Sequence, residues 1–391
     1  MKKLTFILLA FFVTFQSCKK DDPEIDPPIN REEIIISQDI TTNTTWYGDK
    51  IYKVTNSIDV TSRAVLVIKP GCIIQFSKDT ELSIAYSDYG TVIARGTKEE
   101  PILFTSDSPK KQAGDWYGLY LYDGSESSEF DHCIFEYAGG YSSQQATINI
   151  RGGSSRFINS IVRESASFGY EVRPGGKFEG FAYNTVTKTK YDPMKLTANA
   201  VTTLGEFNTF DPGTRIEINR GNLDEPGNHY WEAQPIPYYF SDDLEIGSTS
   251  ASGTILRIAP GTELQFGNQS IEVSVGFSNE KGQLIAIGEP GKPITFTSSS
   301  IAPSQGDWDG IWFYESTLPG STLENCVISY GGGYSYGGNV VFRNNVGANV
   351  TIKNSIISGS QQYGVYKKTG DNAPTLSGNT FSNNAMGDLN W

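Results

Sequence analysis

The sequence predicts an all-β fold in which short parallel strands stack as a solenoid, and two observations carry this prediction. The first is composition, because 12% of the 391 residues are aromatic and 41 are Gly, which favours strands joined by tight turns. The second is an internal repeat, in which residues 65–76 recur as residues 255–266 with the apolar positions, the Pro-Gly turn and the final Gln-Phe kept. Coils that bury their inner residues only against neighbouring coils produce such repeats.

The N-terminal segment predicts export and a lipid anchor. Lys2 and Lys3 precede an apolar run at residues 4–15, which is typical of a signal peptide and too short to span a bilayer. Ser17 and Cys18 at the end of this run resemble the lipobox of bacterial lipoproteins, and the acidic residues that follow resemble the surface-export signal of Bacteroidetes lipoproteins. We therefore expect a signal peptide at 1–17, a lipidated Cys18 with a flexible tether at 18–33, and a surface-exposed protein at the outer membrane. The alternative is an ordinary signal peptide with a chance Cys.

Matching motifs divide the rest of the chain into two tandem units. Residues 96–106 match 288–298, residues 114–122 match 306–314, and residues 133–141 match 326–334. Ile34 and Ile36 match Ile216 and Ile218, which places the boundary near residue 213. We predict one unit at 34–213 and a C-terminally shortened unit at 214–391, together forming one continuous solenoid. A pair of β-sandwiches is the alternative, but it would require longer alternating strands and hairpin signals such as Asn-Gly, which the sequence lacks.

Charge and cysteine content exclude several classes of protein. The net charge is −13, and it becomes −15 for the part after residue 17, because Lys2 and Lys3 are the only charged residues before that point. Such a surface disfavours nucleic acid, anionic lipid and polyanionic glycans. Cys133 and Cys326 occupy matched positions, so we expect both to be buried and far apart. We expect no cofactor or metal, with weak calcium binding by acidic turns as the alternative, at Asp224-Glu225 and Asp242-Asp243.

Four motifs follow one another in the second unit and recur with a few substitutions in the first, and together they carry a resemblance. They are Ile-x-Pro-Gly-Thr-x-Leu-x-Phe, Gly-x-x-x-x-Pro-Ile-x-Phe-Thr-Ser, Gly-Asp-Trp-x-Gly-Ile and Cys-x-Ile-x-Tyr-Gly-Gly. They resemble the repeats of right-handed parallel β-helix proteins of the pectin-lyase-like superfamily, and more closely their Bacteroidetes surface lipoproteins. The resemblance implies a right-handed parallel β-helix over about residues 34–391. It implies no single activity, because this fold carries lyases, hydrolases and adhesins.

The catalytic motifs that the resemblance would imply are not found. Polygalacturonase-like enzymes carry Asn-Thr-Asp and Gly-His-Gly, whereas Asn184-Thr185 is followed by Val186, and His132 and His229 lie in other contexts. Pectate lyases combine calcium-binding carboxylates with an Arg or Lys. Arg151 and Arg343 occupy matched outward positions, but no acidic ladder is evident near them. A pair of Asp115 and Glu136 is not duplicated, since Ser329 replaces Glu136 in the second unit. We therefore predict no catalytic residue.

An aromatic face is the predicted binding surface. Alternation places Ile311 and Phe313 inward and their neighbours outward. Outward rings at strand spacing suit sugar binding, because pyranose faces stack on them, and the candidate residues are Trp116, Tyr120, Tyr122, Trp308, Trp312 and Tyr314. The alternative is that a loop from the next coil covers these rings while Asp115 and Asp307 cap turns.

These observations favour a non-catalytic cell-surface lipoprotein that binds glycans or mediates adhesion, attached to the membrane through its lipid anchor only. Two alternatives stay open: a polysaccharide lyase or glycoside hydrolase with an unrecognised site, and a structural or protein-binding scaffold. Function is best sought where the two units differ, which is at Tyr117 against Asp309, Tyr120 against Trp312, and Glu136 against Ser329.

Overall fold

The computed structural model describes residues 31–391, except for residues 126, 142–144, 335–336 and 345. Glu32–Trp391 form one compact unit. The predicted signal peptide, Cys18 and most of the predicted tether lie outside the described residues. Strand β1 (Glu32–Ile36) begins two residues before the predicted start of the β-helix, because Glu32 and Glu33 pair with Lys50 and Ile51. In the described part of the chain, no helix is long and apolar enough to cross a membrane.

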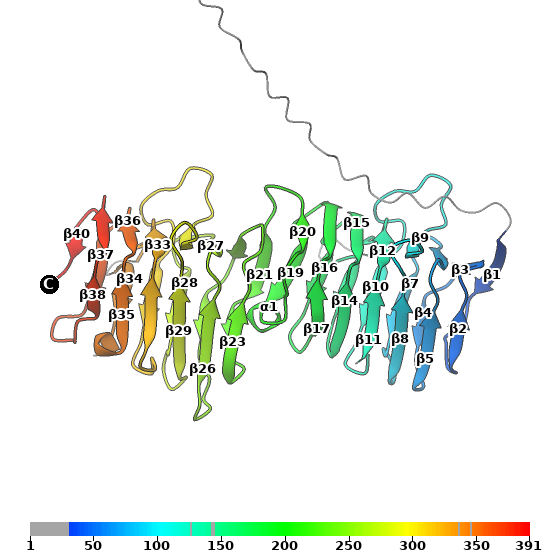
Figure 1. Cartoon of the computed structure of the whole chain (residues 1–391), viewed down its shortest axis with the longest axis horizontal. Helices are drawn as coiled ribbons and strands as arrows, with labels where there is room; N and C mark the ends of the chain where they lie inside the picture. Colours follow the sequence, from blue (N-terminus) through cyan, green and yellow to red (C-terminus); the bar gives the residue numbers. More distant parts are fainter. Residues whose placement is uncertain (1–30, 126, 142–144, 335–336, 345) are drawn as a thin grey trace, which may run out of the picture. The chain divides into compact units, whose positions relative to one another are not determined.

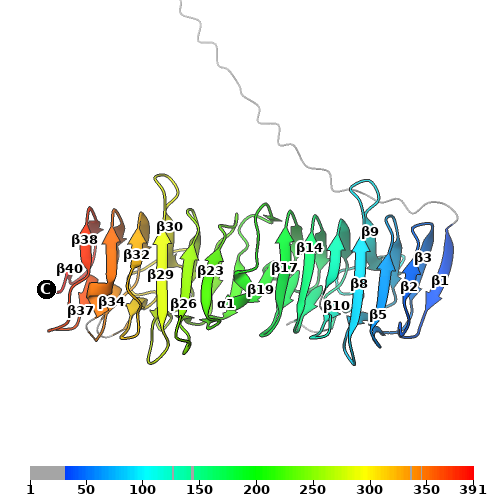
Figure 2. The ribbon, with the colours of Figure 1, turned by 60° about the horizontal axis from the view of Figure 1, so that its bottom comes forward.

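The chain from Glu32 to Trp391 is a parallel β-helix, and the fold prediction is confirmed. Every pair of named strands is parallel, and successive coils stack along one axis from β1 to β40 (Figure 1). Short strands joined by crossover connections that return to a parallel neighbour are consistent with the right-handed form. A second view shows the strands of successive coils side by side along the stack (Figure 2).

The described strands form five sheets, which we label A to E in the order used below. Sheet A contains β1, β3 (Lys50–Val54), β6 (Ile73–Phe76), β9 (Ile102–Ser106), β12 (Cys133–Glu136), β15 (Ile161–Ser165), β18 (Thr185–Thr189) and β20 (Thr209–Phe210). Sheet B contains β4 (Ile58–Val60), β7 (Glu81–Ile84), β10 (Gly118–Leu121), β13 (Ile148–Ile150), β16 (Tyr170–Val172), β19 (Met194–Thr197), β21 (Ile216–Arg220), β24 (Tyr238–Phe240), β27 (Glu263–Phe266), β30 (Ile294–Ser298), β33 (Cys326–Ser329), β36 (Ile356–Ser358) and β39 (Thr380–Ser382).

The other three sheets complete the coils. Sheet C contains β2 (Thr44–Trp46), β5 (Ala64–Ile68), β8 (Gly90–Arg95), β11 (Ser128–Asp131), β14 (Ser154–Ile158) and β17 (Lys177–Ala182). Sheet D contains β22 (Asn222–Leu223), β25 (Leu244–Ile246), β28 (Glu272–Val275), β31 (Gly310–Phe313), β34 (Gly338–Phe342), β37 (Tyr363–Lys367) and β40 (Gly387–Leu389). Sheet E contains β23 (Gly227–Trp231), β26 (Thr254–Ile258), β29 (Gly282–Ile287), β32 (Ser321–Glu324), β35 (Val350–Lys353) and β38 (Thr375–Ser377). Helix α1 (Ala198–Val201) and the 3-10 turn η1 (Val346–Asn349) are short insertions.

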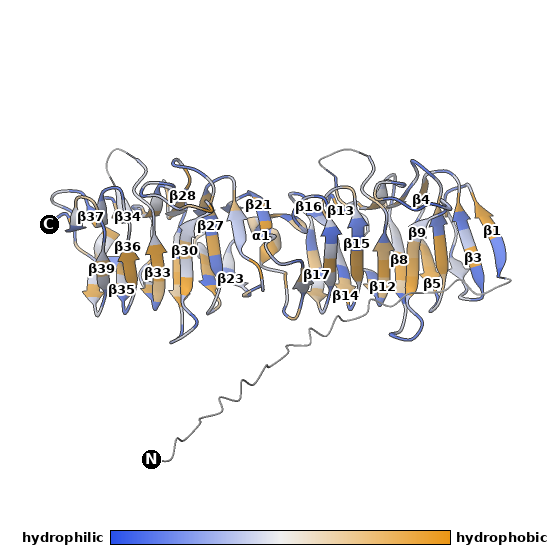
Figure 3. Cartoon of the chain, turned by 90° about the horizontal axis from the view of Figure 1, so that it is seen from above, coloured by the Kyte–Doolittle hydropathy of each residue, from blue (hydrophilic) through white to orange (hydrophobic). Residues whose placement is uncertain are grey.

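The strands form because inward positions alternate with outward ones along each coil. In β5, Ala64, Leu66 and Ile68 are buried, whereas Val65 and Val67 between them are half-buried. Hydrophobic and hydrophilic positions are interleaved along the strands in the same way (Figure 3). The repeated segment is a strand, a turn and a strand as predicted, with positive φ at Gly71 (+72°) and Gly261 (+86°).

Polar side chains bond from coil to coil at the corners. Asn159 has a left-handed backbone with φ +51°, and so has Asn354 with φ +52°, which Asn tolerates better than most residues. Asn184 is instead buried, where its side chain accepts from Ser160 N at 2.9 Å and donates to Phe157 O at 2.9 Å. Such bonds satisfy backbone groups that a corner leaves free.

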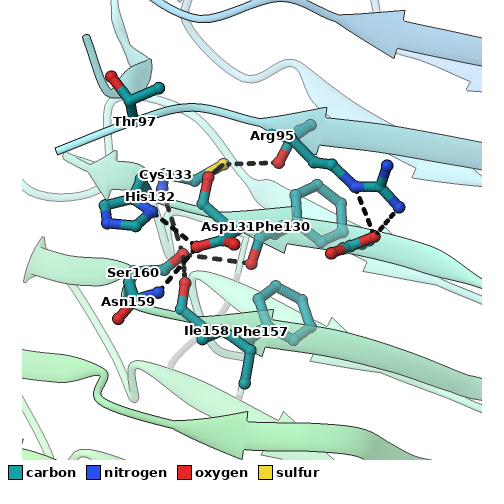
Figure 4. Close-up of polar contacts among 12 residues, drawn as sticks. Arg95, Thr97, Phe130, Asp131, His132, Cys133, Phe157, Ile158, Asn159 and Ser160 are labelled. Atoms are coloured by element: carbon teal, nitrogen blue, oxygen red, sulfur yellow. Dashed lines mark hydrogen bonds and ion pairs between the residues drawn. The ribbon is translucent and has the colours of Figure 1, made fainter. Parts of the chain in front are cut away.

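His132 takes the corner position that Asn325 holds in the matched coil, and both have positive φ. Figure 4 shows this corner. His132 Nδ1 lies 2.7 Å from Asp131 Oδ1, which also accepts from Asn159 Nδ2 at 2.9 Å. The matched Cys133 and Cys326 are buried as predicted, and Ser160 Oγ accepts from Cys133 N at 3.2 Å. These bonds therefore hold neighbouring coils together at this corner.

The ladder of sheet B changes side near the middle of the β-helix. Strand β19 pairs with β21 through Met194 and Ile216, so sheet B runs through both halves. In Figures 1 and 3, the later strands of sheet B nonetheless lie on the side that sheet A occupies in the first half. Sheet D lies on the side that β4, β7 and β10 occupy earlier. The first half of sheet B and sheet D therefore face the same direction.

Candidate functional site

Two residues of the predicted aromatic face are core residues, so their outward assignment is wrong. Trp116 and Trp308 are both 0% exposed. Trp116 stacks on Phe76 with ring centroids 4.0 Å apart, and Trp308 stacks on Phe266 at 4.3 Å. Each indole N–H donates to a backbone carbonyl, Trp116 to Glu136 O at 2.9 Å and Trp308 to Ser329 O at 2.7 Å. The Gly-Asp-Trp motif thus packs one coil on the next.

A glycine explains this error. Gly118 and Gly310 begin their strands with φ of +127° and +122°, which interrupts the strict alternation of an extended strand. The alternation of inward and outward side chains therefore holds from Ile311 onward, since Ile311 and Phe313 are buried in the core as predicted. Before the glycine, the inward and outward positions are exchanged relative to a continuous strand, so Trp308 points inward.

The aspartates of the motif cap turns, as the alternative interpretation predicted. Asp115 Oδ2 accepts from Gln112 N at 2.9 Å and from Ser106 Oγ at 2.6 Å. Asp307 Oδ2 accepts from Ser304 N at 2.9 Å and from Ser298 Oγ at 2.6 Å. One oxygen of each carboxylate thus holds the loop through two hydrogen bonds.

The outward aromatics of the second half line a cavity of about 500 Å³ over sheet D, within the usual size range of ligand pockets. We call it the sheet D cavity. Its lining combines rings, carboxylates and one guanidinium, from Asp243, Ser270, Glu272, Phe277, Asp309, Trp312, Tyr314, Glu315, Tyr334, Arg343 and Asn344. Of the predicted aromatic face, Trp312 and Tyr314 belong to it. Trp312 points outward yet is only 3% exposed, so its neighbours largely cover it, as the alternative interpretation anticipated.

The rings of this cavity are held in fixed contacts. Phe277 meets Tyr314 edge-on, with centroids 4.9 Å apart and planes at 75°. Trp312 and Tyr314 are nearly parallel at 5.9 Å. The guanidinium carbon of Arg343 lies 4.9 Å from the Trp312 ring centroid, within the range of a cation–π contact. The indole N–H of Trp312 is buried and has no hydrogen-bond partner among the described residues.

Three carboxyl groups from successive coils meet in the same cavity. Asp243 Oδ1 accepts from Glu272 N at 2.9 Å, and Glu272 Oε1 accepts from the Tyr314 hydroxyl at 2.9 Å. Asp309 is only 4% exposed, and its Oδ1 accepts from Tyr334 N at 3.1 Å. Arg343 therefore has acidic neighbours that the sequence did not reveal.

Burial shifts the ionisation of these groups. It raises the pKa of Glu272 to about 7, against the hydrogen bond from Tyr314, and the negative charges of Asp309 and Asp243 add to this effect. Burial likewise raises the pKa of Asp309 to about 7, although the N–H of Tyr334 and the charge of Arg343 oppose it. Burial also raises the pKa of Asp243. Two carboxyl groups are therefore partly protonated near neutral pH.

Sequence reasoning did not bring these three acids together, because each comes from a different coil. Asp243, Glu272 and Asp309 are separated by about thirty residues or more, and only strand register places them together. One signal was available, because Asp309 stands where the matched position has Tyr117. Tyr117 instead meets Tyr141 edge-on at 4.8 Å. A comparison of the two predicted units therefore identified one member of the site, but not its partners.

Glu136, the other charged difference, is a structural residue. It is 5% exposed and accepts from Arg163 Nε at 2.8 Å and from Thr105 Oγ1 at 2.8 Å. The matched Ser329 bonds to Thr297 at 3.1 Å without any charge. Glu136 therefore has a structural role as the partner of Arg163 and Thr105.

No group of three or more His, Cys, Asp or Glu within the described ranges is arranged to hold a metal ion. The acidic turns weighed as calcium ligands have other contacts. Asp224 accepts from Asn199 Nδ2 at 2.7 Å, and Asp243 bonds to Glu272 N.

The comparisons with known proteins agree with the fold. A family model described as "Pectate-lyase like beta helix domain" matches residues 38–130, which is less than half of the chain. No curated protein and no solved structure matches the sequence. The chain is thus a parallel β-helix protein with one segment similar to that domain.

Proposed function

We propose that the sheet D cavity binds a neutral glycan, and that the protein is a non-catalytic binding or adhesion protein. The observation that carries this proposal is the shared lining of one cavity by four aromatic rings and several hydrogen-bonding groups, with Phe277, Trp312, Tyr314 and Tyr334 supplying the rings. Aromatic rings bury the apolar faces of sugars, and carboxyl and guanidinium groups bond to their hydroxyls.

The charge of the cavity selects against acidic sugars. Asp243, Glu272, Asp309 and Glu315 face one cation, Arg343. A uronate carboxylate would be placed beside like charges in a partly desolvated site, which is unfavourable. Neutral hydroxyls, in contrast, can donate to ionised carboxylates or accept from protonated ones. The net charge of −13 of the whole chain acts in the same direction.

A glycan array tests this proposal, followed by solution binding of mannan, laminarin, arabinoxylan and polygalacturonate. We expect binding to at least one neutral polysaccharide and none to polygalacturonate. Trp312→Ala and Arg343→Ala should each weaken binding at least tenfold, since each removes one partner of the Arg–Trp contact. The matched control is Tyr230→Ala, which removes a ring that is 45% exposed and lies on sheet E. Equal binding by all variants would overturn the proposal.

A glycoside hydrolase is the second candidate, because one observation favours it. Glu272 and Asp309 share a cavity and both have a pKa raised to about 7, so one can be protonated while the other is ionised. That division of roles is what an acid and a base or nucleophile require in glycoside hydrolysis. We expect Glu272→Gln and Asp309→Asn to abolish any release of reducing ends from neutral polysaccharides. Binding without release by the unmodified chain would exclude this candidate.

We further propose that the protein is a Bacteroidetes-type lipoprotein, anchored through Cys18 at the outer membrane and exposed on the surface. The support is in the sequence, where an apolar run ends at Ser17 and Cys18 and acidic residues follow. Labelling with a radioactive fatty acid tests this. The label should enter the unmodified chain and be lost in Cys18→Ser, and labelling of both would contradict the assignment.

A further inference from the structure

The first half of the β-helix contains a second aromatic cavity, of about 600 Å³, at the ends of three strands of sheet B. We call it the sheet B cavity. Tyr86, Tyr89 and Tyr122 supply its rings and Arg151 its guanidinium, while Asp88 and Asp123 supply acids. Tyr86 is 68% exposed and Tyr89 is 56% exposed, so two of its rings are open to solvent. Its acids outnumber its cation, so it too favours a neutral ligand.

The two cavities repeat one arrangement of side chains. Tyr86 meets Tyr122 edge-on at 5.1 Å and 67°, which matches the Phe277–Tyr314 contact at 4.9 Å and 75°. Arg151 lies 5.1 Å from the Tyr120 ring, as Arg343 lies 4.9 Å from that of Trp312. Of the predicted aromatic face, Tyr120 thus contacts Arg151, and Tyr122 lines the same cavity as Arg151. The hydroxyl of Tyr120 donates to Gln145.

Both cavities face the same direction. The sheet B cavity lies where β7, β10 and β13 end, and the sheet D cavity lies over and beyond β28 and β31. Figures 1 and 3 place sheet D on the side that β4, β7 and β10 occupy in the first half. Seven ladder steps lead from β10 to β30, the strand before β31, and at about 4.8 Å per step the cavities are roughly 34 Å apart along the axis.

The described surface between the cavities is polar, and two ion pairs lie on it. On β16, Glu171 lies 3.2 Å from Arg173, the residue that follows this strand. Lys195 on β19 lies 3.2 Å from Glu217 on β21. On sheet D, Glu245 has acidic neighbours and accepts from Asn222 Nδ2, so this stretch disfavours an acidic chain more than a neutral one.

We propose that a single neutral polysaccharide chain occupies both cavities at once, so that the β-helix binds long glycans more tightly than short ones. This inference rests on the proposed function. Two linked sites on one ligand turn the second binding event into an intramolecular one, and the gain in affinity is typically 10²- to 10⁴-fold. A trisaccharide is too short to reach both cavities, so it shows the affinity of each cavity alone.

The test compares a trisaccharide with its parent polysaccharide, using the first of mannan, laminarin and arabinoxylan that the unmodified chain binds. Affinities are measured in solution with the full chain. Two variants disable one cavity each, Tyr122→Ala with Arg151→Ala and Trp312→Ala with Arg343→Ala, and Tyr230→Ala is the control. Circular dichroism melting shows whether each variant is folded.

We expect the unmodified chain to bind the polysaccharide at least a hundredfold more tightly than the trisaccharide. Each single-cavity variant should still bind the trisaccharide but lose most of this difference. If the Tyr122/Arg151 variant keeps the full difference while the Trp312/Arg343 variant loses all binding, the inference fails and the proposed function stands. If the Trp312/Arg343 variant binds both the trisaccharide and the polysaccharide as tightly as the unmodified chain, the proposed function itself fails.

Discussion

Replacing Glu272 with Gln should make the stability of the β-helix less dependent on pH. In the folded chain the pKa of Glu272 is raised from 4.5 to about 7, so the folded state keeps a proton that the unfolded state loses. Stability therefore falls as the pH rises from the unfolded pKa to the folded one, and it is lower above about pH 7. The glutamine amide of the variant does not titrate, while its carbonyl can still accept from Tyr314.

The magnitude follows from the part of this pH range that an experiment covers. From pH 5.5 up to the folded pKa of about 7, a span of about 1.5 pH units, the folded Glu272 is protonated while the unfolded one is ionised. At about 1.4 kcal/mol per unit, the folded state loses at most about 2 kcal/mol of stability over this range. Urea unfolding at the two pH values measures it. The loss of stability between pH 5.5 and 8.5 should be smaller in Glu272→Gln than in the unmodified chain by up to about 2 kcal/mol.

The control is Glu289→Gln, which alters an exposed glutamate on the loop after β29. It should leave the pH dependence as it is in the unmodified chain. The reasoning is refuted if Glu272→Gln and the unmodified chain lose the same stability between the two pH values. It is also refuted if the variant is the less stable of the two at pH 8.5.

Three further predictions concern stability and are checked by urea unfolding at pH 7. Glu136→Ala should cost about 3–5 kcal/mol, because it leaves the largely buried Arg163 without its carboxylate, and an unchanged midpoint would contradict this. Trp308→Ala should cost about 3–5 kcal/mol, since the indole is 0% exposed, and a loss below about 1 kcal/mol would place this ring outside the core. Gly310→Ala should cost about 1–3 kcal/mol more than Gly291→Ala, because both have positive φ but only at Gly310 would a Cβ lie 2.3 Å from a backbone oxygen; equal costs would argue against this contact.

Local features of the fold could be predicted from the sequence because each depends on a short segment. The Pro-Gly turns, the buried Cys133 and Cys326, and the capping role of Asp115 and Asp307 all involve contacts that recur with the motif. The direction of Ile311 and Phe313 was also correct, because both lie beyond the glycine in a regular strand.

The direction of Trp308 could not be obtained from alternation. Strand periodicity applies only to extended backbone, and Gly310 with φ +122° lies between Trp308 and the strand. The indole is then directed inward, where its N–H finds Ser329 O. Where a Gly interrupts an apparent strand, the inward and outward positions should therefore be assigned separately before and after it.

Sequence spacing alone does not predict which acidic residues lie together in the sheet D cavity. Asp243, Glu272 and Asp309 come together because β25, β28 and β31 are neighbours in sheet D. Loop lengths differ from coil to coil, so the sequence distance between neighbours is not constant. The change of side of the sheet B ladder at β19 and β21 was equally inaccessible, because it depends on how the coils turn about the axis.

Hydroxyl-radical footprinting with mass spectrometry tests the central claim most directly, because it reports which side chains a bound glycan covers. The chain is labelled with and without the neutral polysaccharide that it binds. Phe277 and Tyr334 should be protected, since they are 54% and 58% exposed and line the sheet D cavity. Phe207 and Tyr230 should be labelled equally in both samples. Protection of Phe207 and Tyr230 with Phe277 and Tyr334 unchanged would contradict the assignment of the binding site.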